Sequence, residues 1–343
     1  MFKIYGFFYY LHENAKKSSS PEDDNIWKFY FNSGLTGNPT KYCQNCNLPA
    51  GQGQYYLDEC NFYDDNNRVI NFDPIENSLF LHNRCSFSNC TSTSSGSCIY
   101  FKIGSNSSIV QRKFCCTKCQ SQSQYGAHFS YTYVDKDNLN FFIESSLFDV
   151  GKKGVGLSIY AERDNIIVSS TNFSSCKASW GPAGWFKSLN VIYTTKYNYT
   201  TVVNNLATEQ MILDIWYNAL IDSCNIINNT KTKSDFGIIY HLCNSLTVKS
   251  CSFINNTAPQ GSYLICNSYD QLTVDSCYID NSIPNTYNSS IVPTNTREPF
   301  TNNLIHLSTG NCQAEFAIIN KSISKVNKLS LFLQTLVNIS NSS

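Results

Sequence analysis

The sixteen cysteines are the residues of this chain with the greatest capacity for chemistry. Two groups, Cys43-x-x-Cys46 and Cys115-Cys116-x-x-Cys119, have the close spacing that zinc sites and local disulfides share. The groups lie far apart along the chain, well beyond the spacing of a zinc ribbon, so zinc is the less favoured reading, and we expect no metal site and no cofactor. We expect local disulfides among Cys43, Cys46, Cys60, Cys90, Cys98, Cys115, Cys116 and Cys119.

Other cysteines recur at a regular interval. The set is Cys60, Cys85, Cys224, Cys251 and Cys277. We expect these to be buried thiols that pack as small apolar side chains, because burial raises the pKa of a thiol and keeps substrate away from it. Disulfides between neighbours in the set, Cys224 with Cys251 or Cys251 with Cys277, are the alternative.

Asp222, Lys249 and Asp275 could form a catalytic group. If each lies on a successive coil of a stacked repeat, the two carboxylates stand about 9.6 Å apart with the cation between them, at the outer edge of an inverting glycosidase pair. The favoured reading is an alternating-sign ladder that relieves repulsion between neighbouring strands. The sequence motifs of polygalacturonases are absent, so we expect no catalysis.

The histidines give no further catalytic motif. His12, His82, His128, His241 and His306 do not cluster in the sequence. No His-x-x-x-His pair or glycine-flanked serine is present.

A repeat positions these residues. Leu246-Thr-Val248-Lys-Ser-Cys251-Ser-Phe253 aligns without gaps on the segment from Leu272 to Ile279, which carries Cys277. Sliding this template along the chain finds copies anchored at positions 60, 85, 114, 146, 171, 200, 224, 251 and 277. Their quasi-regular spacing predicts a stack of similar units.

Each copy predicts short strands. Alternation of Leu246 with Val248 and of Cys251 with Phe253 indicates two strands around a corner, each with one buried face. A third strand, often opened by glycine, precedes them, as at Gly237. The sequence therefore predicts a β-solenoid, in which Asn229 and Asn256 stack in a turn column and pair their amides.

This template resembles that of the right-handed parallel β-helix of the pectin-lyase-like superfamily. The Phe-x-x-Asn unit from Phe253 to Asn256 is similar to those of polymorphic outer-membrane-type and protist surface repeat proteins, although their companion Gly-Gly-Ala/Ile unit is missing. The resemblance covers residues 51–320 and implies an all-β, right-handed parallel β-helix of about nine to eleven coils with capped ends.

The ends differ from the repeat. We expect residues 1–50 to form an N-terminal segment and cap, residues 51–320 the β-helix with a projecting loop at 283–303, and residues 321–343 a C-terminal cap. One outward column is apolar: Tyr56, Leu81, Val110, Phe142 and Ile167. We expect a loop or the N-terminal segment to cover this column, and a partner site is the alternative.

The amino-acid composition indicates which partners the protein has and where in or outside the cell it is located. The chain balances 25 basic against 25 acidic residues, so we expect neither nucleic acid nor an anionic membrane as a partner. No apolar stretch approaches the roughly 20 residues of a membrane span, and no signal peptide is clear. Cysteine content and ten sequons indicate an extracellular or cell-surface glycoprotein. The sequons begin at Asn89, Asn106, Asn172, Asn198, Asn228, Asn255, Asn288, Asn320, Asn338 and Asn341.

These observations favour a non-catalytic protein for recognition, adhesion or display, with glycans or surface proteins as partners. The alternative is a polysaccharide-processing hydrolase or lyase that uses Asp222, Asp275 and Lys249. An intracellular scaffold solenoid is the second alternative.

Overall fold

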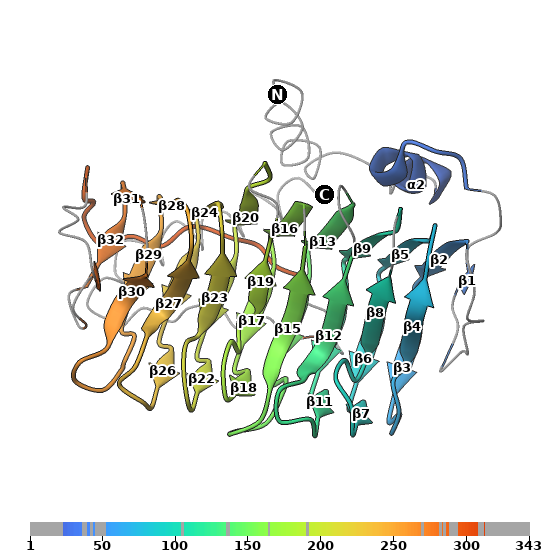
Figure 1. Cartoon of the computed structure of the whole chain (residues 1–343), viewed down its shortest axis with the longest axis horizontal. Helices are drawn as coiled ribbons and strands as arrows, with labels where there is room; N and C mark the ends of the chain where they lie inside the picture. The colour runs from blue at the N-terminus through green and yellow to red at the C-terminus, as the bar shows by residue number, and fades with distance from the viewer. Residues whose placement is uncertain are drawn as a thin grey trace, which may run out of the picture.

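The structure is a computed structural model that describes residues 23–35, 40–41, 44, 53–103, 106–134, 138–163, 165–189, 192–268, 271–280, 283, 286–287, 294–307 and 312. It is a parallel β-solenoid of about eight turns, as predicted in outline (Figure 1). The helix α2 (Asp23–Phe31) precedes it. Cys43, Cys46, His12, Asn288 and the predicted cap at 321–343 lie outside the described residues.

Three long sheets run along the solenoid, and all their pairings are parallel. The first consists of β1 (Thr40–Lys41), β2 (Gln54–Asp58), β5 (Leu79–Asn83), β9 (Ser108–Arg112), β13 (Leu139–Ile143), β16 (Asn165–Ser169), β20 (Thr195–Asn198), β24 (Ala219–Asp222), β28 (Leu246–Lys249) and β31 (Leu272–Asp275). The second consists of β3 (Asn61–Tyr63), β6 (Ser86–Ser88), β10 (Cys115–Thr117), β14 (Ser146–Phe148), β17 (Asn172–Ser174), β21 (Thr201–Val203), β25 (Asn225–Ile227), β29 (Ser252–Ile254) and β32 (Tyr278–Ile279).

The third sheet supplies the strand that precedes each template copy. It consists of β4 (Ile70–Ile75), β8 (Ile99–Ile103), β12 (Ala127–Tyr133), β15 (Leu157–Glu162), β19 (Trp185–Lys187), β23 (Leu213–Trp216), β27 (Gly237–Leu242), β30 (Tyr263–Asn267) and β33 (Thr286–Tyr287). Two small sheets close the turns: β18 (Lys177–Ala178), β22 (Leu206–Ala207) and β26 (Thr230–Lys231), and β7 (Thr91–Ser92) with β11 (Gln120–Ser121).

Register pairing confirms most of the template. Leu246 pairs with Leu272, Val248 with Val274, and all four side chains are buried. One copy is displaced by a residue, because Phe142 rather than Phe141 pairs with Val168. Phe142 is therefore inside the solenoid, where its ring lies 6.1 Å from that of Phe186, and the prediction that it faces outward is wrong.

Two corners in each coil take the left-handed backbone conformation. The corner between the first and second sheets has positive φ at Glu59, Arg84, Lys113, Glu144, Ser170, Tyr199, Ser223, Ser250 and Ser276. The corner after the second sheet has positive φ at Asp64, Asn89, Lys118, Asp149, Ser175, Asn204, Asn228 and Asn255. Asn and Asp tolerate this conformation best among residues with a side chain, which accounts for part of the asparagine richness of the second corner.

A ladder of asparagines follows the second corner inside the solenoid. The Nδ2 group of Asn205 donates to Oδ1 of Asn229 at 3.0 Å, and Nδ2 of Asn229 donates to Oδ1 of Asn256 at 3.0 Å. Each amide also donates to a backbone carbonyl, as Asn229 does to Val202 at 2.9 Å. The predicted pairing of Asn229 with Asn256 is confirmed, and it satisfies polar groups that would otherwise be costly to bury.

The helix α2 covers the apolar column on the outside of the first sheet. Trp27 is fully buried there, with its ring 6.2 Å from that of Tyr56, and it packs in one cluster with Leu81 and Val110. Cover by the N-terminal segment is thus confirmed for these positions, and Phe141 takes the place in the column that had been assigned to Phe142.

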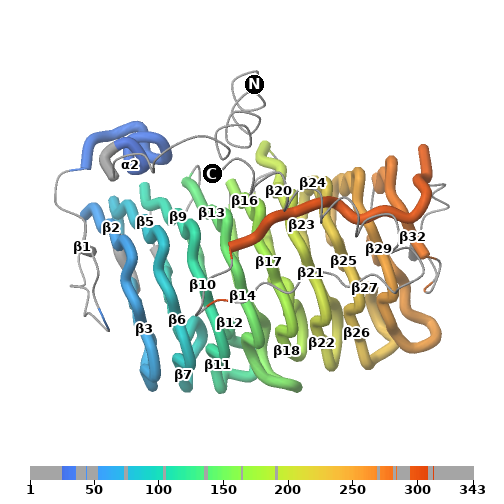
Figure 2. Tube along the Cα trace, turned by 180° about the vertical axis from the view of Figure 1, so that it is seen from behind, coloured from blue at the N-terminus to red at the C-terminus, as the bar shows by residue number. Residues whose placement is uncertain are grey.

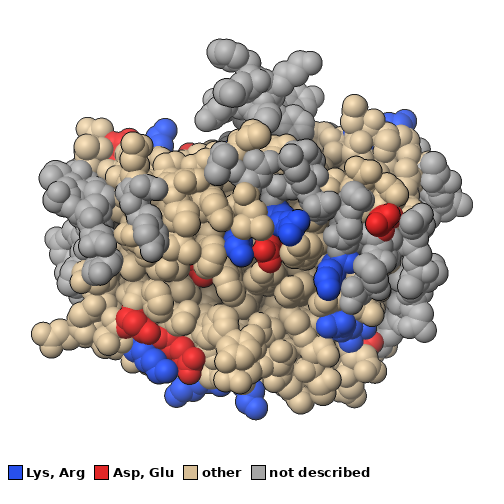
Figure 3. All heavy atoms as spheres, viewed as in Figure 1, with Lys and Arg blue, Asp and Glu red and all other residues tan. Residues whose placement is uncertain are grey.

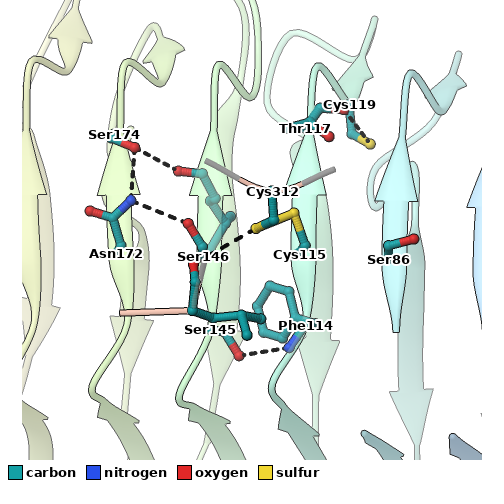
Figure 4. The surroundings of a disulfide bond; sticks show 12 residues. Ser86, Phe114, Cys115, Thr117, Cys119, Ser145, Ser146, Asn172, Ser174 and Cys312 are labelled. Atoms are coloured by element: carbon teal, nitrogen blue, oxygen red, sulfur yellow. Dashed lines mark hydrogen bonds between the residues drawn. A yellow bond between two sulfur atoms is a disulfide. The ribbon is translucent and has the colours of Figure 1, made fainter. Parts of the chain in front are cut away.

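A C-terminal strap, defined as residues 294–307 and 312, runs back along the second sheet (Figure 2). The backbone N–H of Asn302 donates to Asn225 at 2.8 Å, its carbonyl accepts from Asn225 at 2.9 Å, and His306 contacts Thr201 at 2.6 Å. Cys312 is bonded to Cys115 by a disulfide (Figure 4). The prediction of a projecting loop is therefore wrong for residues 294–303, which hydrogen-bond first to Asp275 of the first sheet and then to Ser252 and Asn225 of the second.

Replacing Asn229 with leucine, an apolar residue of similar size, removes the centre of the ladder. We expect the free energy of unfolding to fall by about 2–4 kcal/mol, because Asn205 and Asn256 lose buried partners. Denaturant titration measures this free energy. Thr273→Ala, on the exposed side of β31, should change the same quantity by less than about 0.5 kcal/mol. Equal losses in the two variants would show that the ladder adds nothing.

Candidate ligand-binding face

The outward side of the third sheet carries a column of aromatic residues. Tyr100, Tyr131, Tyr160 and Trp185 are paired in register on β8, β12, β15 and β19. The first three rings stack, with centroids 5.1 and 4.7 Å apart and nearly parallel planes. Strand alternation turns these side chains away from the core, and all four are half-buried. The column therefore presents ring edges and phenolic groups to solvent along the solenoid.

Tryptophans extend this column into a cluster. The ring of Trp185 is perpendicular to that of Tyr160 and lies 6.0 Å from Trp180 and 5.7 Å from Trp216. Tyr125, which is 68% exposed, packs against Trp180 at 5.2 Å. Three of the four tryptophans of the chain thus gather on one outer face. We call Tyr125, Trp180, Trp185 and Trp216 the tryptophan cluster.

Polar groups fix the rings of the cluster. The indole N–H of Trp216 donates to Asp214 at 2.7 Å, and the ammonium of Lys187 lies 4.8 Å from the centre of the Trp216 ring. Lys187 also pairs with Glu162 at 3.3 Å, and Glu162 accepts a hydrogen bond from the phenol of Tyr160. Burial raises the pKa of Asp214 well above its ordinary value, which the Trp216 hydrogen bond and Lys187 oppose in part.

This arrangement is suited to binding rather than to bond cleavage. Half-exposed indole rings offer apolar faces, and the neighbouring phenols, carboxyls and ammonium offer hydrogen bonds, a combination typical of recognition surfaces. Figure 3 shows that the charged side chains over this face are few and that acidic and basic groups lie side by side. A large uncharged ligand would therefore contact the aromatic rings without passing through a strong electrostatic field.

The proposed catalytic residues lie elsewhere, on the first sheet. Asp222, Lys249 and Asp275 are paired in one column on β24, β28 and β31, as the repeat predicted. The carboxylate of Asp275 accepts hydrogen bonds from Asn295 at 2.7 Å and Thr294 at 3.0 Å. These bonds hold the pKa of Asp275 below its ordinary value, and they join it to the C-terminal strap. Such a carboxylate is unsuited to donate a proton.

The same outward column runs through Asp58, Asn83, Arg112 and Ile143, which pair in register on β2, β5, β9 and β13. Glu144, the next residue, occupies the corner and pairs with Arg112 at 3.1 Å.

The cysteines differ in whether they form a disulfide or carry a buried thiol. Cys115 faces outward from β10 and is bonded to Cys312, a partner outside the expected set. Cys90, Cys98, Cys116 and Cys119 carry free, buried thiols in the structure, and Cys60 is also buried. The thiols of Cys85, Cys224, Cys251 and Cys277 are likewise free, and the backbone N–H of Cys224 donates to Sγ of Cys251 at 3.4 Å. Within the described part of the chain, Cys90, Cys98 and Cys119 form the one group suited to hold a metal ion.

The described sequons differ in accessibility. Asn89, Asn106 and Asn255 are exposed and Asn228 is half-buried. Asn172 is fully buried, and its amide donates to Ser146 at 3.2 Å and Ser174 at 2.8 Å. Asn198 is also buried. The fold has no room for a glycan at Asn172 or Asn198, so these two candidates are wrong. Asn288, Asn320, Asn338 and Asn341 fall outside the described residues.

Four histidines are buried at separate places. His82 lies inside the solenoid with Nε2 at 3.3 Å from Gln111, and burial lowers its pKa to about 3. His128 accepts a hydrogen bond from the backbone of Ser121 at 2.9 Å, and burial lowers its pKa to about 4. The pKa of His306 is lowered to about 4 for the same reason. His241 bridges Asn267 and a backbone carbonyl. These histidines serve packing.

No protein family model, curated protein or solved structure matches this chain. Among the described residues, no helix has both the length and the apolar character needed to cross a bilayer.

The aromatic column was missed because its strand lies upstream of the template at a variable distance. Tyr131 precedes its interior anchor Ser145 by 14 residues, whereas Tyr160 precedes Thr171 by 11. The recurring signal was an aromatic residue flanked by small or apolar residues in four consecutive strands of the third sheet, β8, β12, β15 and β19. Aligning those strands separately would have found it.

Acid should destabilise the protein through its buried histidines. Below pH 6.5 the unfolded chain binds protons that folded His82, His128 and His306 exclude, so the free energy of unfolding falls with pH from 6.5 toward about 4. Each histidine contributes up to about 1.4 kcal/mol per pH unit. Denaturant titration across this range gives the slope of the free energy of unfolding against pH, which should be smaller by one proton in the His82→Leu variant. Leucine suits this position, because Leu57 fills the same column in the preceding coil. An unchanged slope would refute the assignment.

Proposed function

We propose that this chain is a non-catalytic recognition protein, exposed outside the cell, that binds an extended glycan across the tryptophan cluster. The observation that carries this function is the gathering of Trp180, Trp185 and Trp216 on the outside of a solenoid whose other large apolar column is covered by α2. An exposed aromatic surface of this kind marks a binding site.

The chemistry of the cluster favours a sugar polymer. Indole faces pack against the C–H faces of sugar rings, while Glu162 and the phenol of Tyr160 can exchange hydrogen bonds with hydroxyl groups. The aromatic column continues along the axis at the coil spacing of about 4.8 Å, so a linear chain could follow it over several coils. A polymer would thus gain many weak contacts in sequence.

We also propose that the solenoid is a right-handed β-helix of nine to eleven coils and a member of the pectin-lyase-like superfamily. The template and the three parallel sheets are consistent with this assignment. Many proteins of that architecture act on or bind polysaccharides, which agrees with a glycan ligand but does not specify one.

Replacing Trp185 with alanine should weaken glycan binding by about tenfold or more, because the central ring of the cluster is lost. The measurement is binding to a printed glycan array, followed by calorimetry with the polysaccharide that binds best. Tyr63→Ala removes a ring that is 45% exposed on β3, on another sheet, and should leave affinity unchanged.

Asp222→Asn and Asp275→Asn separate binding from catalysis. Both variants should bind the same glycan with unchanged affinity, and the wild-type chain should release no reducing or unsaturated ends from it. Turnover that disappears in these variants would replace the recognition function with the enzymatic alternative. Equal loss of binding in Trp185→Ala and Tyr63→Ala would place the site away from the cluster.

Exposure outside the cell has its own test. Protein from its native source should carry glycans at Asn89, Asn106 and Asn255, which are exposed, and none at Asn172, which shares the consensus but is buried. Enzymatic deglycosylation in heavy-oxygen water followed by mass spectrometry reads each site. Bare asparagines at all exposed sequons would favour an intracellular scaffold instead.

A further inference from the structure

Four thiols converge inside the solenoid at its N-terminal half. The sulfurs of Cys90, Cys98 and Cys119 lie within 4.8 Å of one another, and all three residues are fully buried. The thiol of Cys116, also fully buried, is within hydrogen-bonding reach of Cys98 and Cys119. We call these four residues the thiol cluster.

Two adjacent coils build the thiol cluster. Cys90 and Cys119 occupy the same column after the second corner, since the strands before them pair residue by residue. Cys116 points inward from β10, and Cys98 lies immediately before β8 on the opposite side of the interior. Each coil thus supplies two sulfurs, those of Cys90 and Cys98 from one coil and those of Cys116 and Cys119 from the next.

Packing alone does not require sulfur at these positions. In the next coil Leu147 pairs with Cys116, and Val150 follows β14 at the place that Cys119 holds after β10. Both are fully buried. An apolar side chain therefore fills either column, and the four cysteines are grouped where the two coils meet.

We infer that the thiol cluster binds a single Zn²⁺ ion as a buried tetrathiolate site. Four sulfurs at about 2.3 Å from a tetrahedral zinc ion lie about 3.8 Å apart. The sulfurs of Cys90, Cys98 and Cys119 lie within 4.8 Å of one another, and Cys116 is placed to be the fourth ligand. One central ion satisfies all four sulfurs together, whereas a disulfide pairs them two by two.

Parallel stacking disfavours the simplest disulfide. Side chains in one column of adjacent parallel strands are about 4.8 Å apart and point the same way, whereas disulfide Cβ atoms lie about 3.8 Å apart. Cys90 and Cys119 have this relationship. So do Cys224 and Cys251, which carry free thiols in the structure although Cys115 and Cys312 are bonded.

Metal binding would deprotonate the thiols of the cluster. Binding exchanges four thiol protons for Zn²⁺, so the bound site carries two negative charges. The ion would enter while the coils stack, because the folded cluster is buried.

The test uses the full chain, produced with zinc and purified with a phosphine reductant. Elemental analysis should find one zinc ion per chain after gel filtration. Protein produced with Co²⁺ alone should show the intense visible bands of tetrahedral cobalt bound to thiolates. Cys119→Val and Cys116→Leu, which copy the residues of the next coil, should fold but retain no metal and lose the cobalt bands. Cys251→Ala removes a buried thiol outside the cluster and should retain one ion.

Three results would overturn the inference. The first is wild-type protein without stoichiometric zinc and without the cobalt bands. The second is a folded Cys119→Val or Cys116→Leu variant that keeps its metal. The third is a non-reducing peptide map of protein from its native source that shows the four cysteines paired as disulfides. The wild-type cobalt spectrum decides the question even if a variant fails to fold, and it is independent of glycan binding.

Discussion

Each buried side chain of this solenoid packs against the residue at the same position one coil away. Parallel, in-register pairing imposes this rule, because the coils are separated by one inter-strand spacing. An aromatic ring therefore meets another ring, as Phe62 meets Phe87 at 5.1 Å in a stacked arrangement. A buried polar group can find its partner within its own column, as the asparagines from Asn205 to Asn256 do.

The same rule explains what could be predicted from the sequence. Columns with a distinctive residue, such as Cys224, Cys251 and Cys277, revealed the register, and the residues around them aligned correctly. The copy around Phe141 and Phe142 has Ser145 in place of the cysteine, and either phenylalanine could satisfy the alternation. Shifting a strand by one residue reverses its two faces, so this ambiguity led to the wrong prediction that Phe142 faces outward.

The candidate sites were harder to predict than the fold for a geometric reason. The tryptophan cluster and the thiol cluster each join residues from strands that no single template aligns. Trp180 lies in a turn, Trp185 and Trp216 lie in the third sheet, and Cys98 precedes that sheet on the side opposite Cys116. The column of Asp222, Lys249 and Asp275, by contrast, lies within the template, and its register was predicted correctly.

The C-terminal strap alters how the repeat responds to force. Coils that contact only their neighbours can separate one at a time from an open end. Here the disulfide between Cys115 and Cys312 encloses a loop of 197 residues that contains most of the coils. Tension applied between a point before Cys115 and a point after Cys312 would pass through this bond and bypass the enclosed coils. The later coils, which carry Trp180, Trp185 and Trp216, would then remain folded under a load that extends the rest of the chain.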